Sequence, residues 1–338
     1  MRRILLILVI GVLVFGLWFR HALSPTDASN TKEESFSVES GQSIGIIAAN
    51  LEERGLIRSP WAFKWYARIT GVAGKLQAGS FAVSPSASSS EIIDILHSGK
   101  TQEFFVTVPE GYTVADIDKL MAAKGLGKPG DIIDCAFRCD FETFDFLPLK
   151  AAGMREKGIG SRLEGYLFPE TYSVSPTEYN PKFFLERMLG TFRKKIVNGH
   201  ESEIAASGKT LHQVVTMASL VEEESRHDEE RAQVAGILWK RLENRVVLGV
   251  DATTRYVLGK RTEVLTKADV ETDSAYNTRR TQGLPPSPIA NPGESAITAT
   301  LSPKESPYWY YLHDKTGVIR YAVTNDEHNV NKAKYLGR

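Results

Sequence analysis

An apolar run that ends in three carboxylates is the most informative pattern in this chain. Residues 211–221 read Leu-His-Gln-Val-Val-Thr-Met-Ala-Ser-Leu-Val, and Glu222, Glu223 and Glu224 follow directly. The apolar positions recur at helical spacing, so the pattern predicts a helix over 211–224. Burying an unpaired carboxylate is costly, and the usual escape is a raised pKa. The run therefore predicts a carboxyl group that keeps its proton near neutral pH, as a general acid must.

The three glutamates fall on different faces of this predicted helix. Its core stripe includes Val214 and Ala218, and a spacing of four extends the stripe to Glu222. Glu224 lies beyond the apolar residues 217, 220 and 221. Glu223 lies between the two faces, and we expect it to be solvated surface.

The pattern after this helix predicts three further segments. Apolar residues at helical spacing predict a second helix over 229–242. Residues 248–256 are predicted to form a loop that holds one acid, Asp251, among polar groups. The proline and glycine density of 283–293 predicts a rigid, non-helical wall.

An internal repeat organises the first part of the chain. Residues 38–55 align without gaps with 108–125, so that Gly41 pairs with Gly111 and Ser43 with Thr113. Each copy predicts a strand, a glycine turn and a helix that is capped by the hydroxyl and ended by a second glycine.

The first copy continues into a predicted strand (78–83) and helix (90–96). Together these segments resemble a LysM glycan-binding module, which we place at residues 36–105. The alternative for the second copy is a generic strand–helix unit that packs on a neighbour.

The N-terminus has the pattern of a membrane segment. Arg2 and Arg3 precede an uncharged run from Ile4 to Phe19, and Arg20 and His21 close it. The positive-inside rule favours an uncleaved single-pass anchor (1–23) in the cytoplasmic membrane, with most of the chain on the periplasmic or extracytoplasmic side. A cleaved secretory signal is the alternative. Residues 24–35 are polar and predict a linker.

Composition and charge narrow the chemistry. The 338 residues suggest about two domains, and 41 basic residues balance 41 acidic ones, which gives no reason to expect a nucleic-acid partner. No histidine or cysteine cluster has metal-ligand spacing, so no metal or other cofactor is expected. Cys135 and Cys139 are four residues apart; a disulfide would be strained in a regular helix, and two independent thiols are favoured.

Several motifs in order resemble the MltG (YceG-like) endolytic murein transglycosylase family. The resemblance implies a membrane-anchored enzyme that cuts peptidoglycan glycan strands internally, with a catalytic domain over 106–338. The fold implied is α+β: a transmembrane helix, a small LysM-like module and a larger α+β catalytic domain. The motifs lie at 108–111, 163–172, 218–224, 276–278, 283–286, 289–293 and 327–328.

The resemblance also implies roles for individual residues. Glu224 matches the catalytic acid of the family, and Glu222 is its supporting residue, either an electrostatic partner or a structural acid that binds backbone amides. Candidate sugar contacts, each with a structural alternative, are Asp251, Tyr276, Asn277 and Thr278.

This sequence also departs from the family pattern near those contacts. Ala252 stands where the family usually has proline, and Gly249 stands where it often has glutamine. Arg279 and Arg280 follow the Tyr-Asn-Thr motif where an uncharged residue is usual. The departures affect the substrate contacts and leave the acid in place.

The implied reaction is a lytic cleavage between N-acetylmuramic acid and N-acetylglucosamine that leaves 1,6-anhydro ends and terminates or trims nascent strands. The implied partners are peptidoglycan strands, the membrane and the glycan polymerases. A muramidase that hydrolyses the same bond with water, and a non-catalytic cell-wall scaffold, are the alternatives.

Overall fold

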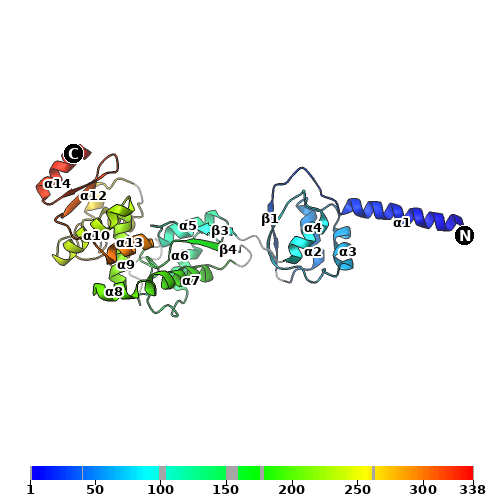
Figure 1. Cartoon of the computed structure of the whole chain (residues 1–338), viewed down its shortest axis with the longest axis horizontal. Coiled ribbons are helices and arrows are strands. Elements are labelled where there is room, and N and C mark those ends of the chain that lie inside the picture. Colours follow the sequence, from blue (N-terminus) through cyan, green and yellow to red (C-terminus); the bar gives the residue numbers. More distant parts are fainter. Residues whose placement is uncertain are drawn as a thin grey trace. The chain divides into compact units, whose positions relative to one another are not determined.

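The computed structural model describes residues 2–39, 41–98, 104–149, 159–175, 179–260 and 263–337. The chain divides into two compact units: a small unit of residues 1–106 and 173–179, and a large unit of residues 107–172 and 180–338. Both contain helices, and short two-stranded sheets complete the mixed α+β architecture that the sequence predicts (Figure 1).

The small unit is built on an antiparallel pair of strands covered by helices. Phe36 pairs with Phe81 across this sheet, and both side chains enter a core shared with Leu51, Phe63 and Ile92. The elements are α1 (Arg2–Ala22), β1 (Glu34–Val38), α2 (Ile44–Glu53), α3 (Pro60–Ile69), β2 (Gly79–Val83) and α4 (Ser89–Ser98).

The segments predicted as a membrane anchor (1–23) and a linker (24–35) both belong to this unit. Within the described residues, no helix has both the length and the apolarity that crossing a membrane requires. The segment predicted as a linker is hydrogen bonded to the small unit: the Thr26 hydroxyl donates to the carbonyl of Gly55 (2.7 Å), and the Arg58 guanidinium donates to the carbonyl of Pro25 (2.8 Å).

The internal repeat is confirmed in the local structure of both copies. The Ser43 hydroxyl caps α2, and the Thr113 hydroxyl caps α5 (Val114–Ala123). The turn glycines Gly41 and Gly111 have φ values of 80° and 74°. A left-handed backbone of this kind favours glycine, which explains why both copies have it at the turn. Whether the first copy binds glycan as a LysM module does stays a prediction.

The large unit is mostly helical, and α9 runs through its core. The eight residues Val214–Val221 are all buried, and α9 packs against α10 and α13. Its observed bounds, Leu211–Glu224, are those that the hydrophobic pattern predicts. Thr210 and Gln213 form a capping box at its start.

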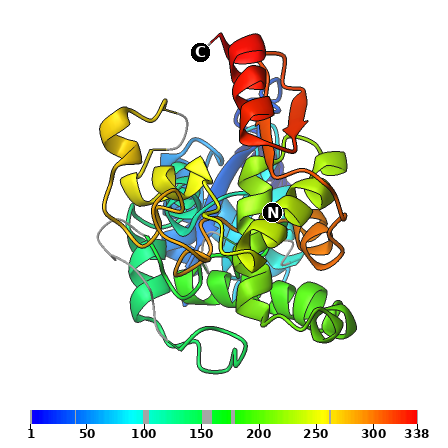
Figure 2. The same cartoon turned by 90° about the vertical axis from the view of Figure 1, so that its left-hand side faces the viewer.

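The C-terminal hairpin and α14, in orange and red, stand at the top of the view in Figure 2. The remaining elements of the chain are as follows. After α5 the helices are α6 (Asp131–Arg138), α7 (Pro181–Phe192), η2 (Arg193–Val197), α8 (Glu201–Ser207), α10 (Asp228–Glu243), α11 (Asp251–Leu258), α12 (Lys267–Val270), α13 (Glu294–Leu301), α14 (Asn325–Asn331) and η3 (Lys332–Leu336). The strands are β3 (Phe104–Thr107) paired with β4 (Thr171–Val174), and β5 (Tyr310–His313) paired with β6 (Ile319–Ala322).

The predicted loop over 248–256 is wrong, because α11 begins at Asp251. Thr253 and Thr254 are fully buried in this helix, and Gly259 ends it in a left-handed conformation. Threonine has a weak helix propensity, and here tertiary packing overrides it. The neighbouring prediction is confirmed, since residues 283–293 form no helix.

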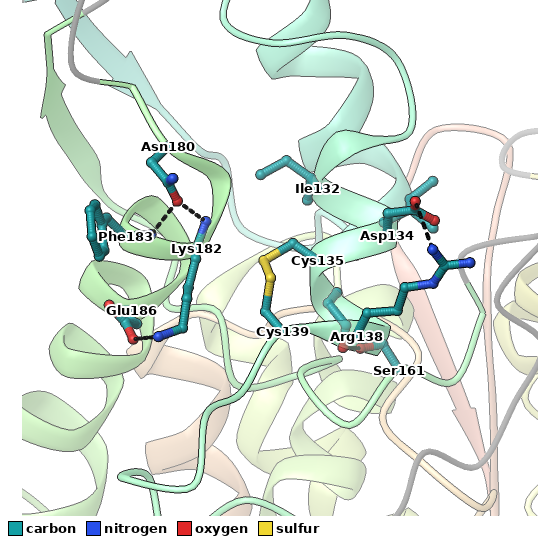
Figure 3. The surroundings of a disulfide bond; sticks show 12 residues. Ile132, Asp134, Cys135, Arg138, Cys139, Ser161, Asn180, Lys182, Phe183 and Glu186 are labelled. Carbon is teal, nitrogen blue, oxygen red and sulfur yellow. Dashed lines mark hydrogen bonds and ion pairs between the residues drawn. A yellow bond between two sulfur atoms is a disulfide. The ribbon is translucent and has the colours of Figure 1, made fainter.

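The prediction of two independent thiols is also wrong, because Cys135 and Cys139 form a disulfide. Cys139 is the residue after α6, and its extended backbone (ψ 152°) takes it off the helical path. The two Cα atoms are 4.7 Å apart, a normal distance for a disulfide. Figure 3 shows the bond facing the start of α7, where Lys182 and Glu186 form an ion pair (3.0 Å).

Candidate active site

A cleft of about 760 Å³ opens at the C-terminal end of α9. Its walls come from α9, α10, α11, β5 and the C-terminal residues, all within the large unit. The charged and polar side chains that line it are Glu223, Glu224, Arg226, Arg241, Asp251, Arg255, Arg279, Tyr310, Tyr311, His313, Asn325, His328 and Lys332.

Glu224 is the partly buried acid of this cleft. Burial raises the pKa of its carboxyl group from 4.5 to about 7, while a hydrogen bond opposes the shift. That hydrogen bond comes from the Tyr311 hydroxyl, which donates to Oε2 at 2.9 Å. Near neutral pH the carboxyl group of Glu224 is therefore protonated in a large fraction of molecules, which is what a general acid requires.

The charges around Glu224 differ from those that the sequence suggests. Asp251 and Glu223 raise its pKa further, and Arg255 lowers it. The predicted electrostatic contribution of Glu222 is replaced by these two other carboxylates. Glu223 is exposed, as expected, but it lines the cleft as well.

Glu222 is directed into a different network. Its side chain is 8% exposed; Arg231 donates to Oε1 at 2.7 Å, and the backbone N–H of Gly293 donates to Oε2 at 3.0 Å. Burial raises the pKa of Glu222, although Gly293 and Arg231 oppose the shift. This geometry matches the alternative in which Glu222 is a structural acid that joins α9, α10 and the start of α13.

Asp251 lies in the cleft at the first position of α11. Its Oδ1 accepts a hydrogen bond from the Nε of Arg279 at 2.6 Å. Arg279 is one of the two arginines that depart from the family pattern. The departure therefore has a structural consequence, because this arginine pairs with a cleft carboxylate and lines the same cleft.

The other three predicted substrate contacts, Tyr276, Asn277 and Thr278, are buried, and none of them lines the cleft. The Tyr276 hydroxyl is hydrogen bonded to Ser287 at 2.7 Å. The Asn277 amide donates to the carbonyls of Val270 (2.9 Å) and Thr272 (2.8 Å). Since these polar groups are satisfied inside the protein, the geometry favours their structural alternatives.

Thr278 acts on the site through the backbone. Its hydroxyl accepts a hydrogen bond from the N–H of Val250 at 3.0 Å, and its carbonyl accepts one from the N–H of Gly249 at 2.9 Å. These two bonds fix the segment that immediately precedes Asp251. Thr278 is thus a positioning residue for the start of α11.

Buried polar groups hold the second repeat copy (108–125) against α11. Glu164 is fully buried; it accepts a hydrogen bond from the N–H of Val114 (3.0 Å) and another from the Tyr256 hydroxyl (2.9 Å). The Asn291 amide donates to the carbonyl of Tyr112 (2.7 Å). The motifs around 164 and 291 therefore fix α5 next to α11.

A second hollow, of about 140 Å³, lies between α5 and α11. Thr113, Asp116 and Lys119 contribute from α5 and its cap. Glu223 and Arg255 line both hollows. The protein surface beside Glu224 therefore has a hollow on each side of Glu223 and Arg255.

Several residues of the cleft are not among the site residues that the sequence predicts. Tyr311 and Arg255 act directly on the charge state of Glu224. His328 stacks on the Tyr310 ring with a centroid distance of 5.2 Å, and burial lowers its pKa to about 4. His328 belongs to the motif at 327–328, which indicates no contact with Tyr310. For Tyr311 the aromatic run 308–311 is the available signal, and nothing local indicates that it meets a helix 87 residues earlier in the sequence.

The described residues contain no group of three or more His, Cys, Asp or Glu side chains that could hold a metal ion. The titratable groups that line the cleft are instead Glu224 and its charged and polar neighbours. Fold and site together define a class: an α+β protein that presents a carboxyl group of raised pKa in an open cleft, as a general-acid enzyme does.

Comparisons with known proteins identify the family. The model of the YceG-like family matches residues 36–334. The endolytic murein transglycosylase of Bacillus subtilis (strain 168) is 31% identical over 333 residues, which cover 96% of this chain and 90% of that protein. The chain belongs to the YceG-like family.

Two further relatives agree with this assignment. The endolytic murein transglycosylase of Streptococcus pneumoniae serotype 2 is 29% identical over 341 residues; the match covers 93% of this chain and 60% of that longer protein. The crystal structure of a YceG-like protein from Listeria monocytogenes has 28% identity and a TM-score of 0.61, and the match covers 88% of this chain and 98% of that one.

Proposed function

We propose that this protein is an endolytic peptidoglycan lytic transglycosylase. It cleaves the glycosidic bond between N-acetylmuramic acid and N-acetylglucosamine within glycan strands. The observation that carries the proposal is the state of Glu224: a carboxyl group with a pKa of about 7, hydrogen bonded to Tyr311 in a cleft of about 760 Å³. The names of the relatives at 31% and 29% identity support the substrate class.

The reaction uses Glu224 twice. Its protonated carboxyl group donates the proton to the glycosidic oxygen, and the C1–O bond of the muramic sugar breaks. The C6 hydroxyl of the same sugar then forms a bond to C1, and the Glu224 carboxylate removes the proton of that hydroxyl. The products are a 1,6-anhydro end and a free 4-hydroxyl end, and the acid is regenerated without water.

Other cleft residues support this cycle. The carboxylates of Asp251 and Glu223 favour the protonated acid before cleavage, because they raise its pKa. Arg255 and the Tyr311 hydroxyl favour the carboxylate that forms after proton donation. A carboxyl group whose neighbours keep its pKa near 7 can both donate and accept a proton at neutral pH.

Internal cleavage requires room for the strand on both sides of the broken bond. The cleft and the hollow between α5 and α11 share Glu223 and Arg255, so sugars have space on either side of them. Such a groove suits a continuous strand. Endolytic cutting terminates or trims nascent strands, and we propose the glycan polymerases as partners on that ground.

A hydrolytic muramidase is the second candidate, because the cleft contains a second carboxylate. Asp251 could direct a water to C1 if its ion pair with Arg279 (2.6 Å) opened. Mass spectrometry of products from purified strands separates the two reactions, since anhydro ends are one water lighter. Products that carry one added water would favour the muramidase.

Digestion of purified peptidoglycan by the wild type and the Glu224→Gln variant tests the proposed function. The variant should form anhydro products far more slowly than the wild type while keeping its fold and its binding to glycan. The matched control is Glu229→Gln, which changes an exposed glutamate of α10 and should leave the products unchanged. Normal lysis by the Glu224 variant would show that another group is the acid.

The location and the small unit complete the proposal. We propose that α1 attaches the protein to the cytoplasmic membrane, with the large unit on the extracytoplasmic side. Exposed apolar side chains on α1, such as Leu13 (61%) and Leu17 (69%), support attachment. The Cys135–Cys139 disulfide supports an oxidising compartment. Glycan binding by the first repeat copy, in the manner of a LysM module, would hold the strand near the cleft.

A further inference from the structure

The small unit has an exposed aromatic surface that the proposed reaction does not use. It is formed by two helices, α1 and α3, which both belong to this unit. We call it the aromatic face, and it consists of Phe15, Trp18, Phe19, Trp61 and Trp65.

The rings of the aromatic face form one continuous cluster. The Trp61 ring lies 5.6 Å from that of Trp18 and 5.6 Å from that of Trp65, measured between centroids. These side chains nevertheless remain open to solvent: Trp61 is 43% exposed and Trp65 is 44% exposed. Exposed tryptophans in contact with one another are costly in water and indicate an interaction surface.

Helix α3 has the pattern of a helix that lies on a membrane surface. Trp61, Trp65 and Ile69 follow one another at intervals of four residues, and Ile69 is 70% exposed. Lys64 and Arg68 flank this stripe, and the ten residues of α3 contain no acid. A stripe of tryptophan and aliphatic residues beside basic ones suits the headgroup region of an anionic bilayer.

The other side of α3 is accounted for by the fold. Ala62, Phe63 and Ala67 are fully buried in the core of the small unit. The tryptophans are therefore not needed for the core. Their position is continuous with the exposed apolar side chains of α1, so both helices offer one surface to the same partner.

We propose that the aromatic face, together with Lys64 and Arg68, docks the small unit onto the headgroup region of an anionic phospholipid bilayer. The inference rests on the proposed attachment of α1 to the membrane and extends it to a second helix. Docking would hold the first repeat copy at the bilayer surface. The small unit would then contact the bilayer through α3 as well as through α1.

A glycan strand is the competing partner, because tryptophans also stack on sugars. The geometry favours lipid. The rings pack on each other at interplanar angles of 87° for Phe15–Trp61 and 44° for Trp61–Trp65, so they do not form separate flat platforms. Ile69 and the α1 side chains extend the surface with apolar groups, which suit acyl chains better than hydroxyl groups.

The test uses the full chain with Trp18→Phe, so that the two exposed tryptophans of α3 report on their own surroundings. Vesicles of phosphatidylcholine and phosphatidylglycerol that contain brominated lipid quench indoles at the bilayer, and iodide quenches those in water. We expect strong quenching by the brominated lipid, and at least a twofold loss of iodide quenching when vesicles are added. Trp239, which is 5% exposed, and Trp309 give the background.

The matched control adds Trp61→Leu and Trp65→Leu to the same chain, and the lipid-quenched emission should disappear. Activity on soluble glycan strands should remain, which shows that this variant is folded. Lys64→Gln with Arg68→Gln should reduce vesicle binding most at high phosphatidylglycerol content.

Three outcomes would overturn the inference. If the chain does not sediment with vesicles, both the attachment and the docking fail. If it sediments while the α3 tryptophans stay open to iodide, the docking alone fails. If soluble glycan strands shield these tryptophans and vesicles do not, the face is a sugar platform. Loss of the transglycosylase reaction would leave each of these results unaffected.

Discussion

Glu222 and Glu224 are two residues apart on the last turn of α9, yet they meet opposite surroundings. Glu222 extends the core stripe and is held by Arg231 and by the N–H of Gly293. Glu224 faces the cleft and accepts a hydrogen bond from a neutral donor, Tyr311. Burial raises both pKa values, but only at Glu222 does an ion pair oppose it directly. The partner, more than burial, distinguishes the structural acid Glu222 from Glu224, the proposed catalytic acid.

The largest expected effect follows from replacing each acid in turn. Glu224→Gln should reduce the rate of anhydro-product formation by roughly 10²–10⁴-fold, because proton donation is lost. Glu222→Gln should keep most of the activity of the folded fraction. Product formation measured per folded molecule checks both. Equal losses in the two variants would mean that the acids act as a pair.

The next effect concerns stability. Arg231→Met leaves the Glu222 carboxylate without its ion-pair partner inside the protein, and it should lower the free energy of unfolding by about 3–5 kcal/mol. Lys182→Met, which removes the partly exposed i,i+4 pair with Glu186, should cost under about 0.5 kcal/mol. Urea denaturation measures both. A loss below about 1 kcal/mol in the Arg231 variant would show that the Glu222 network is weak.

A third effect is the pH dependence of that free energy. The pKa of Glu224 is about 7 in the folded state and about 4.5 in the unfolded chain. Between these values the folded protein binds more protons, so this group makes stability fall as pH rises through 4.5–7. Glu224→Gln removes the loss, and relative to wild type it should gain about 1–3 kcal/mol between pH 5 and pH 8. Denaturation midpoints at both pH values measure it, and an unchanged difference would contradict the raised pKa.

The contrast between the two acids also shows what the sequence could predict. Helical periodicity predicted the bounds of α9, because the apolar residues that pack in the core and the residues that cap the helix lie close together in the sequence. The same periodicity placed Glu222 on the buried stripe, which explains why it needs a cation. Glycine and hydroxyl positions likewise predicted both repeat copies, since the turns and caps are local.

The hydrogen-bond partners of the candidate site residues are set by the folded structure, and local sequence patterns do not identify them. Tyr311 reaches Glu224 only because the β5–β6 hairpin lies at the end of α9. Tyr276 and Asn277 are candidate sugar contacts in the family resemblance, each with a structural alternative, and the geometry favours the alternative. They are buried because Ser287 and two backbone carbonyls satisfy them. Contacts of this kind depend on tertiary packing, which one sequence does not encode locally.

The smallest effect tests the neutral partner of Glu224. The Tyr311 hydroxyl stabilises the carboxylate and lowers its pKa, so Tyr311→Phe should raise that pKa above about 7. Activity that requires the protonated acid would then persist to higher pH, with its alkaline limb displaced upward by up to about one unit. Asp251→Asn should move the limb in the opposite direction, because Asp251 raises the same pKa. Rate profiles from pH 5 to pH 9 measure both displacements. Shifts of the same sign would mean that the two variants act through a change in the cleft other than the charge state of Glu224.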